Sequence, residues 1–292
     1  MTHEPLEDGQ RRFALLTKSY LPDLERCELL VDSVQRCAPD LTHYLVVDRI
    51  DYPAFRHLGD RAEIILSEDL LPFGAHRTSR RAYWLTRHAW PTRGWIMQQI
   101  LKIAAARQLE SDYFICCDSD VAFVRPFSPS RLMANGDVGL LDVAFVNDDV
   151  RSWTQFAAGA LGVDRAHLDV RGHVGELVCW SQEHIVGMTE RMQSVTGSHW
   201  YRPLLRARSF SEYILYGVYV REILGYPAAS HFPSTDPLCL GLWERNLTDQ
   251  RLETFFAEQV QAENIAVMVY SKGGVDPQRY RSLVERCWES NI

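Results

Sequence analysis

The sequence predicts an α/β fold. Short apolar runs alternate along the chain with longer amphipathic stretches, which is typical of strands that alternate with helices. The 292 residues are 46% hydrophobic and 24% charged, so they can bury one large core or two small ones. The sequence contains no internal repeat, low-complexity tract or flexible linker. We therefore expect a single domain over residues 1–292, with irregular insertions.

Strands are predicted where a short apolar run ends at polar or turn-forming residues. The first run is followed by the polar Thr17, and the second ends at Asp48. Runs of this kind occupy residues 13–16, 43–47, 63–66, 113–117, 138–146 and 265–270.

Helices are predicted where apolar residues recur every three or four positions. One begins near Asp23, and the last opens at Asp276-Pro277, because aspartate caps a helix and proline is favoured at the first helical position. Further helices are predicted between these two, over residues 94–109, 181–195 and 211–224. Residues 67–93 are rich in Arg, His, Pro and aromatic side chains and are expected to form a long loop or lid. Residues 147–210 are expected to be less regular.

The composition excludes several classes of function. Thirty-one Lys and Arg residues against 38 Asp and Glu give a formal net charge of −7, which excludes a polybasic nucleic-acid binder. No apolar run approaches the roughly 18 residues of a spanning helix, and residues 1–12 are too polar for a secretory signal. Seven cysteines without a CxxC pair indicate reduced thiols rather than a zinc cluster. We therefore expect a cytoplasmic protein without a membrane span.

The strongest chemical motif is a pair of carboxylates that follows the apolar run at 113–117. In extended backbone alternate side chains point the same way, so Asp118 and Asp120 can converge just beyond the strand. Ligands of open α/β sheets bind at this end of the strands. Two like charges need a counter-charge, and carboxylates completed by a nucleotide diphosphate suit Mg²⁺ or Mn²⁺. The motif indicates a divalent metal site, and the alternative is an Asp-rich turn that leaves a strand.

The helix predicted at 94–109 carries an unusual polar stripe opposite its apolar face. Trp95, Gln98, Gln99 and Lys102 share this stripe, where a solvated face would carry pairs of Glu and Lys. Tryptophan offers a stacking surface, the amides offer donors and acceptors, and the lysine offers a cation. The stripe indicates a partly desolvated binding surface. Alternatively, the helix packs on both sides and its glutamines cap loop backbone.

Residues 77–90 form a second local concentration of charge. Four arginines, Arg77, Arg80, Arg81 and Arg87, lie there among aromatic residues in an otherwise acidic protein. Guanidinium groups bind phosphates or carboxylates in a bidentate manner, so this loop can clamp an anionic ligand. A solvated surface loop is the alternative.

In their order along the chain, these motifs resemble the nucleotide-sugar-dependent glycosyltransferases of the GT-A fold. The likeness runs from about residue 12 to 270 and includes the segment 17–20, Asp48 and the helix before Asp118-Ser119-Asp120. More narrowly, the chain is similar to a bacterial glycosyltransferase-like family of polysaccharide and natural-product gene clusters. That family carries the same W-x-x-Q-Q-x-x-K helix before a DSD, followed by S-E-Y-x-x-Y-G, here at 211–217.

The resemblance implies a GT-A, Rossmann-like domain with a mixed central sheet. Its nucleotide-sugar-binding half covers about 12–146, and its acceptor-side half with the C-terminal helix covers 147–292. The implied metal ligands are Asp118, Asp120 and His231, although a lone loop histidine can also be structural. The implied nucleotide-sugar-binding residues are Thr17, Lys18, Tyr20, Asp48, Trp95, Gln98, Gln99, Lys102, Asp118, Ser119 and Lys272. For Lys272, in the Gly-rich turn 271–274, a plain turn without a ligand is the alternative.

The implied reaction is metal-dependent transfer of a sugar from a nucleotide-diphosphate sugar to a hydroxyl or amine acceptor. A UDP-sugar is the usual donor of this fold, and a saccharide or small molecule is the expected acceptor. A carboxylate base can take the acceptor proton, and Glu212 is the candidate because it shares a helix face with Tyr216 and Tyr219. Alternatively, Glu212 only stabilises the helix N-terminus and the tyrosines belong to the core.

Two rival functions stay open. A haloacid-dehalogenase-type phosphohydrolase also places Asp-x-Asp after an apolar strand and would use Asp118 as its nucleophile, although its motif normally lies near the chain start. A non-catalytic relative would bind nucleotide sugars without turnover.

Overall fold

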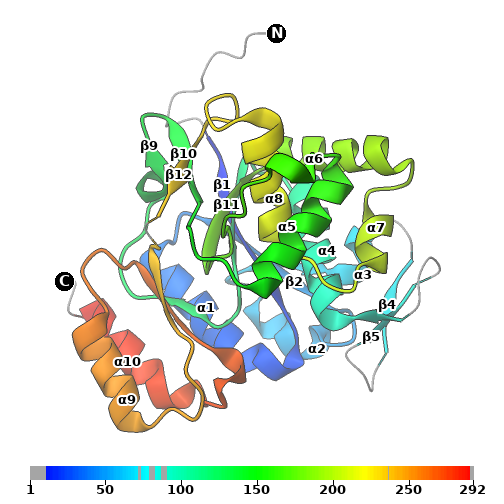
Figure 1. The fold of residues 1–292 in the computed structure, drawn as a ribbon. Coiled ribbons are helices and arrows are strands. Elements are labelled where there is room, and N and C mark those ends of the chain that lie inside the picture. The colour runs from blue at the N-terminus through cyan, green and yellow to red at the C-terminus, as the bar shows by residue number, and fades with distance from the viewer. Residues whose placement is uncertain (1–10, 72–73, 79–82, 87–90, 236, 290–292) are drawn as a thin grey trace.

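The central layer of the protein is a five-stranded sheet of mixed direction (Figure 1). In the computed structural model, the described residues are 11–71, 74–78, 83–86, 91–235 and 237–289. The strand order is β11-β7-β1-β2-β3, and β11 alone runs antiparallel to its neighbour. These strands are β1 (Phe13–Ser19), β2 (Thr42–Val47), β3 (Glu63–Leu66), β7 (Tyr113–Cys117) and β11 (Leu177–Ser181). The predicted α/β fold with a mixed central sheet is therefore confirmed.

Three smaller sheets surround the central one. Their orders are β12-β10-β9, β13-β14-β8 and β4-β5-β6. Because β8 starts directly after Asp120 and pairs antiparallel with β14, a strand from the C-terminal part lies beside the end of β7. The strands are β4 (His76–Arg77), β5 (Tyr83–Leu85), β6 (Thr92–Arg93), β8 (Val121–Phe123), β9 (Met133–Ala134), β10 (Asp137–Leu141), β12 (His231–Ser234), β13 (Cys239–Leu242) and β14 (Ala266–Val269).

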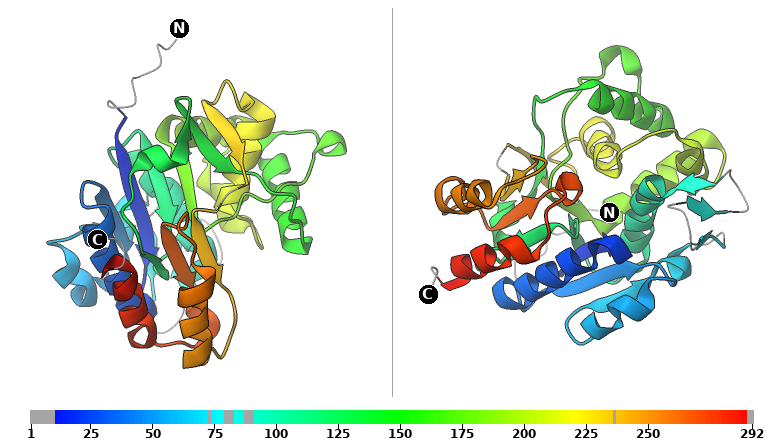
Figure 2. Two further views of the ribbon diagram at one scale, coloured as in Figure 1. Left: turned by 90° about the vertical axis from the view of Figure 1, so that its left-hand side faces the viewer. Right: turned by 90° about the horizontal axis from the view of Figure 1, so that it is seen from below.

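Helices cover both faces of the central sheet. α8 continues as a wider turn over residues 219–224, and α10 lies beside α1 (Figure 2). The helices are α1 (Leu24–Cys37), α2 (Tyr52–Phe55), α3 (Ser67–Leu70), α4 (Gly94–Gln108), α5 (Asp148–Leu161), α6 (Gln182–Thr196), α7 (Tyr201–Arg206), α8 (Glu212–Val218), α9 (Asp249–Thr254) and α10 (Gln278–Glu289). None of those formed by the described residues is long and apolar enough to span a lipid bilayer.

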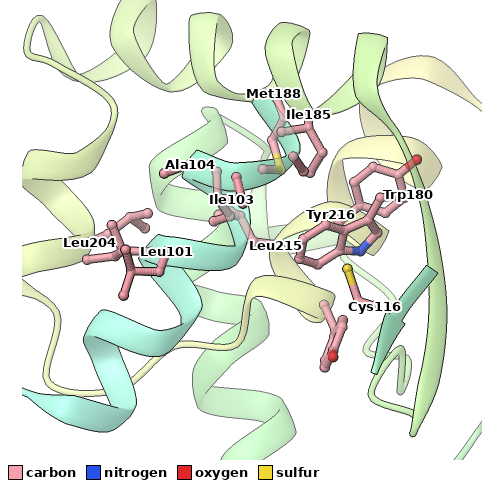
Figure 3. Close-up of a cluster of buried hydrophobic side chains, with 14 of the residues drawn as sticks. Leu101, Ile103, Ala104, Cys116, Trp180, Ile185, Met188, Leu204, Leu215 and Tyr216 are labelled. Carbon is pink, nitrogen blue, oxygen red and sulfur yellow. The ribbon is translucent and has the colours of Figure 1, made fainter. Parts of the chain in front are cut away.

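The core follows the alternation of side chains along the strands. Cys116 and Trp180 belong to the cluster on the face covered by α4, α6 and α8, whereas Ile115 and Cys117 belong to the cluster on the α1 face. Side chains of α4 and α8 gather with Trp180 in Figure 3, where Trp180 and Tyr216 have ring centroids 5.8 Å apart. Residues on this face therefore fix how α4 and α8 sit on the sheet.

Some elements differ from the sequence prediction. The strand expected at 138–146 ends at Leu141, and the carboxylate of the next residue, the buried Asp142, accepts hydrogen bonds from the side chains of Arg171 and Tyr226. The region 147–210, expected to be less regular, contains α5, with Asn147 as its N-cap, and β11. In the region 67–93, expected to be a loop, the described residues form α3 and the sheet β4-β5-β6.

The packing of α8 gives a direct test of this core. Leu215 is fully buried three residues after Glu212. We expect Leu215→Ala to lower the free energy of unfolding by about 2–5 kcal/mol in urea denaturation, since a buried leucine leaves a cavity. Val195→Ala, at an exposed position on α6, should change it by only about 0.5 kcal/mol. Equal losses in the two variants would contradict this description of the core.

Candidate active site

The candidate site lies at the edge of the central sheet where the parallel strands end. Asp118 and Asp120 follow β7, Tyr20 follows β1, and Asp48 follows β2. β11 runs the opposite way and starts at this edge, and its register pairs Leu177 with Cys117, so Glu176 comes beside Asp118. Across the edge the order is therefore Glu176, the two aspartates, Tyr20 and Asp48.

A buried lysine joins three elements behind the aspartates. Lys102 of α4 is only 2% exposed, and its Nζ donates to Asp118 Oδ1 at 2.7 Å, to the Tyr213 hydroxyl at 2.9 Å and to Glu212 Oε1 at 3.2 Å. Burial opposes its charge, but Asp118, Tyr213 and Glu212 together raise the pKa of Lys102 well above its ordinary value. Burial also raises the pKa of Glu212. The structure thus brings Lys102, Asp118 and Glu212 together, as one hydrogen-bonded cluster.

The two aspartates have different environments. The Asp118 side chain is 50% exposed. Asp120 is half-buried, and its carboxylate accepts a hydrogen bond from the Ser271 N–H at 2.9 Å; the intervening Ser119 is buried. Burial, followed by the charge of Asp118, raises the pKa of Asp120 to about 6. The pair therefore presents two partly exposed carboxylates that repel each other and favour a bound cation.

The side chains in the polar stripe of α4 have two different environments. Trp95 is exposed, with its ring centroid 6.0 Å from that of Trp153, and Gln98 Nε2 lies 3.5 Å from Asp118 Oδ1. Gln99 is buried, and its Oε1 accepts a hydrogen bond from the Glu212 N–H at 3.0 Å. This corrects the expectation for Gln99: its amide positions the first residue of α8 and is not free for a nucleotide sugar.

The residues expected to bind the nucleotide after β1 are also satisfied within the protein. Thr17 is fully buried and hydrogen-bonds to His43 and to Cys117 Sγ, so it offers no surface to a ligand. Lys18 is buried, with its Nζ 2.8 Å from Asp48 Oδ1. These positions correct the expected nucleotide contacts of Thr17 and Lys18. The first exposed side chain of this segment is Tyr20.

Asp48 belongs to a buried ion-pair cluster on the β2 side. Besides Lys18, its carboxylate accepts hydrogen bonds from Ser67 at 2.7 Å and from Arg77 at 2.9 Å. Burial raises the pKa of Asp48, but these partners more than offset burial and lower it. The Arg77 guanidinium also lies 5.7 Å from the ring centroid of Tyr20. Asp48 therefore holds the protein's own cations, which corrects its expected contact with a base or ribose.

The other arginines expected to bind an anion belong to the same loop as Arg77. Arg80, Arg81 and Arg87 lie outside the described residues.

His231, expected as a metal ligand, lies at the opposite end of β7. Its Nδ1 donates to the Ala229 carbonyl at 2.7 Å, so its Nε2 accepts from the Tyr216 hydroxyl at 3.0 Å. The same hydroxyl accepts from the N–H of Ser181, which pairs with Tyr113 at the start of β7. Asp118 follows the other end of that strand. His231 therefore has no free nitrogen and faces away from the aspartates, which corrects its assignment as a ligand.

Several residues at the edge were missed by the sequence analysis. Asp23 precedes α1, and burial raises its pKa, which the neighbouring Arg26 and the exposed Lys272 partly offset. The side chains of Glu176 and the exposed Trp243 lie beside each other, and Glu176 is close enough to Asp118 to sense its charge. A signal for Glu176 was available in principle, since it immediately precedes the apolar run 177–180. Recognising it required knowing that this run is an antiparallel strand next to β7.

The lysine cluster predicts strong coupling between its members. Lys102→Met would leave Asp118 and Glu212 without their counter-charge, so we expect the free energy of unfolding at pH 7 to fall by about 3–5 kcal/mol. Adding Glu212→Gln removes one of the stranded charges and should restore part of this loss. A double-mutant cycle by chemical denaturation measures the coupling. Strictly additive effects of the two substitutions would show that the cluster is not a unit.

The buried His231 predicts a specific dependence of stability on pH. Burial lowers its pKa to about 4, and the neighbouring His184 acts in the same direction, whereas Asp137 opposes it. An unfolded histidine titrates near 6.5, so the contribution of the neutral ring is complete above that pH and is lost as the pH falls toward 4. Between pH 7 and pH 5, the stability difference between wild type and His231→Gln should shrink by about 1–2 kcal/mol. A difference that stays constant in urea denaturation would contradict a buried, neutral His231.

Comparison with known proteins gives one family and 226 similar chains of solved structures, including the three that follow. An active-site mutant of LgtC is 10% identical with a TM-score of 0.49, covering 94% of this chain and 95% of that one. The galactosyltransferase LgtC with donor and acceptor sugar analogues is 11% identical with a TM-score of 0.47, covering 96% of each chain. Mouse xyloside xylosyltransferase 1, in its apo form, is 11% identical with a TM-score of 0.48, covering 90% of this chain and 99% of that one.

The family match is made at the level of sequence. No curated protein matches the chain. The model of DUF6492, a family of unknown function, matches residues 13–281, which is most of the chain. The chain therefore belongs to the DUF6492 family.

Proposed function

We propose that the protein is a metal-dependent glycosyltransferase that moves a sugar from a nucleotide-diphosphate sugar to a hydroxyl or amine acceptor. The observation that carries this proposal is the pair Asp118 and Asp120 at the carboxyl edge of the sheet, backed by the buried cluster of Lys102 and Glu212. Ligands of open α/β sheets bind at this edge. The resemblance of the sequence motifs to GT-A enzymes supports the same reaction class.

The donor set at the edge fits a hard divalent cation that is shared with a substrate. Within the described part of the chain, no group of three or more His, Cys, Asp or Glu side chains is arranged to hold a metal ion. Mg²⁺ is commonly held by one or two carboxylates, with water and substrate phosphates completing its shell. Asp118 and Asp120 would hold Mg²⁺ or Mn²⁺ in this way. When bound, the cation supplies positive charge that stabilises a departing diphosphate.

We assign the other side chains around that pair to separate roles in the reaction. Lys102 occupies one oxygen of Asp118 and so orients this carboxylate. Trp95, Gln98 and Tyr20 are the exposed or half-exposed groups beside the aspartates, and we assign them to the nucleotide sugar. Glu212 is our candidate for the general base: it is 4% exposed and accepts a hydrogen bond from Lys102, and burial raises its pKa.

The test uses nucleotide sugars and a cation together. UDP-, GDP-, dTDP- and ADP-sugars are each compared with and without Mn²⁺ in thermal unfolding, and we expect a UDP-sugar to stabilise the wild type only with Mn²⁺. A ligand at 100 times its Kd stabilises the folded state by about 2.7 kcal/mol. Asp120→Asn should abolish the Mn²⁺-dependent stabilisation and lower turnover by about 10²–10³-fold, whereas the exposed Asp40→Asn should keep both.

Other results of these experiments would refute the proposal or indicate a different function. Wild-type-like transfer by Asp120→Asn would refute the proposal. Stabilisation by a nucleotide sugar without turnover would identify a binding protein rather than a transferase. Phosphate release from a phosphomonoester that depends on Asp118 would instead identify a phosphohydrolase.

A further inference from the structure

An exposed tryptophan beside the aspartates has a packed neighbour on each of two sides. Trp243 follows β13 and is 59% exposed, more than Trp95 at 41%. The end of the Glu176 side chain lies beside the Trp243 indole Nε1, and the ring centroid of Trp243 lies 5.4 Å from that of Tyr270. An exposed aromatic ring that is fixed in this way loses little conformational entropy when a ligand stacks on it.

The backbone connects this indole to the candidate metal pair. The Tyr270 N–H donates to the Leu242 carbonyl at 3.1 Å, just before Trp243. The next residue, Ser271, donates its N–H to Asp120. Trp243 and Asp120 are therefore held by adjacent residues of one turn, and a ligand on the indole lies next to the aspartates.

Glu176 lies between the same indole and the other aspartate, Asp118. Its position one residue before β11 brings it beside Asp118, and it is half-buried. Glu176 and Trp243 lie on the β11 side of the aspartates, whereas Tyr20 and Asp48 lie on the β1–β2 side. The two sides of the edge therefore offer separate places for two substrates.

A glycine makes room for the contact between Glu176 and Trp243. A Cβ on Gly241 would lie 2.5 Å from Trp243 Nε1 and 2.6 Å from Glu176 Oε1, closer than atoms can approach. Both of these atoms are at the ends of side chains, so an added methyl group would push the pair apart with little strain on the backbone. Gly241 thus allows the carboxylate and the indole to meet.

Glu176 also lines a cavity that the proposed donor site does not use. The cavity has a volume of about 740 Å³ and lies between β10, β12 and β13. This volume is in the range of small-molecule sites. Besides Glu176, the polar side chains of its wall are Ser234, Gln259, Gln261, Asn264, Glu263 and Arg131, so it offers a hydroxyl, amides, carboxylates and one guanidinium. Such groups match the hydroxyls of a polyol.

We propose that Trp243, Glu176 and the adjoining cavity form the binding site for a neutral saccharide acceptor. The apolar face of a sugar ring packs on the indole, and its hydroxyls donate hydrogen bonds to the Glu176 carboxylate. An anionic acceptor is disfavoured, because Glu176, Asp118 and Asp120 all repel negative charge and the chain has a net charge of −7. This inference rests on the proposed transferase function and assigns its second substrate.

The binding test needs no donor. Saturation-transfer NMR is recorded on the wild type with the methyl glycosides of glucose, galactose, mannose and N-acetylglucosamine. We expect transfer to at least one of them, and a Kd about tenfold higher in Trp243→Ala and in Gly241→Ala. Trp243→Phe should retain part of the affinity because it keeps an aromatic face. Tyr83→Ala removes an exposed aromatic ring on β5 and should leave glycoside binding unchanged.

A parallel measurement of the donor side separates the two proposals. Thermal unfolding with UDP and Mn²⁺ should give the same stabilisation in Trp243→Ala as in the wild type. If the wild type responds to UDP and Mn²⁺ but binds none of the glycosides, or binds them equally without the indole, the acceptor assignment is wrong and the transferase proposal stands. If Trp243→Ala loses the response to UDP instead, the indole belongs to the nucleotide. A wild type that binds the glycosides but responds to no nucleotide sugar would leave the saccharide site intact and reject the transferase.

Discussion

The buried charge of Lys102 is the constraint around which the candidate site is arranged. An ammonium group that is 2% exposed is stable only if anionic and hydrogen-bonding partners surround it. Asp118 lies 16 residues away and Glu212 lies 110 residues away, so the lysine joins α4, the end of β7 and the start of α8. The helices reach it because the core beneath them packs Leu215 and Tyr216 against α4 and Trp180 (Figure 3). A change in that packing would separate the charges.

The sheet edge has two sides with different properties. On the β1–β2 side, the charges of Lys18 and Arg77 are balanced by those of Asp48 and Asp51, and little polar capacity is left for a ligand apart from Tyr20. On the β11 side, Trp243 is open and Glu176 borders a cavity. The half-exposed Asp118 lies between them. This asymmetry is the physical basis for placing one substrate on each side of the aspartates.

Single polar residues at strand ends predicted ligand contacts less well than the carboxylate pair Asp118 and Asp120. Thr17, Asp48 and His231 all stand where ligand contacts were expected, yet each finds its hydrogen-bond partners inside the protein. Burying an unpaired polar group is costly, so a folded chain usually supplies such a group with a partner of its own. A polar side chain at the end of a strand therefore indicates a ligand only when it keeps an exposed face or an uncompensated charge. Asp118 keeps an exposed face, and Asp120 is half-buried with a raised pKa.

The sequence by itself determined the features that depend on neighbouring residues. The apolar runs predicted four strands of the central sheet, the helical spacing predicted α4 with Lys102 on its polar stripe, and the alternation of an extended chain predicted that Asp118 and Asp120 lie just past β7. The tertiary structure decided which distant residues meet there. The antiparallel pairing of β11 put Glu176 beside Asp118, the turn after β14 brought Trp243 next to Asp120, and the contact with Tyr216 drew His231 to the far end of β7. These outcomes depend on strand pairing across long stretches of chain, which no local pattern of residues encodes.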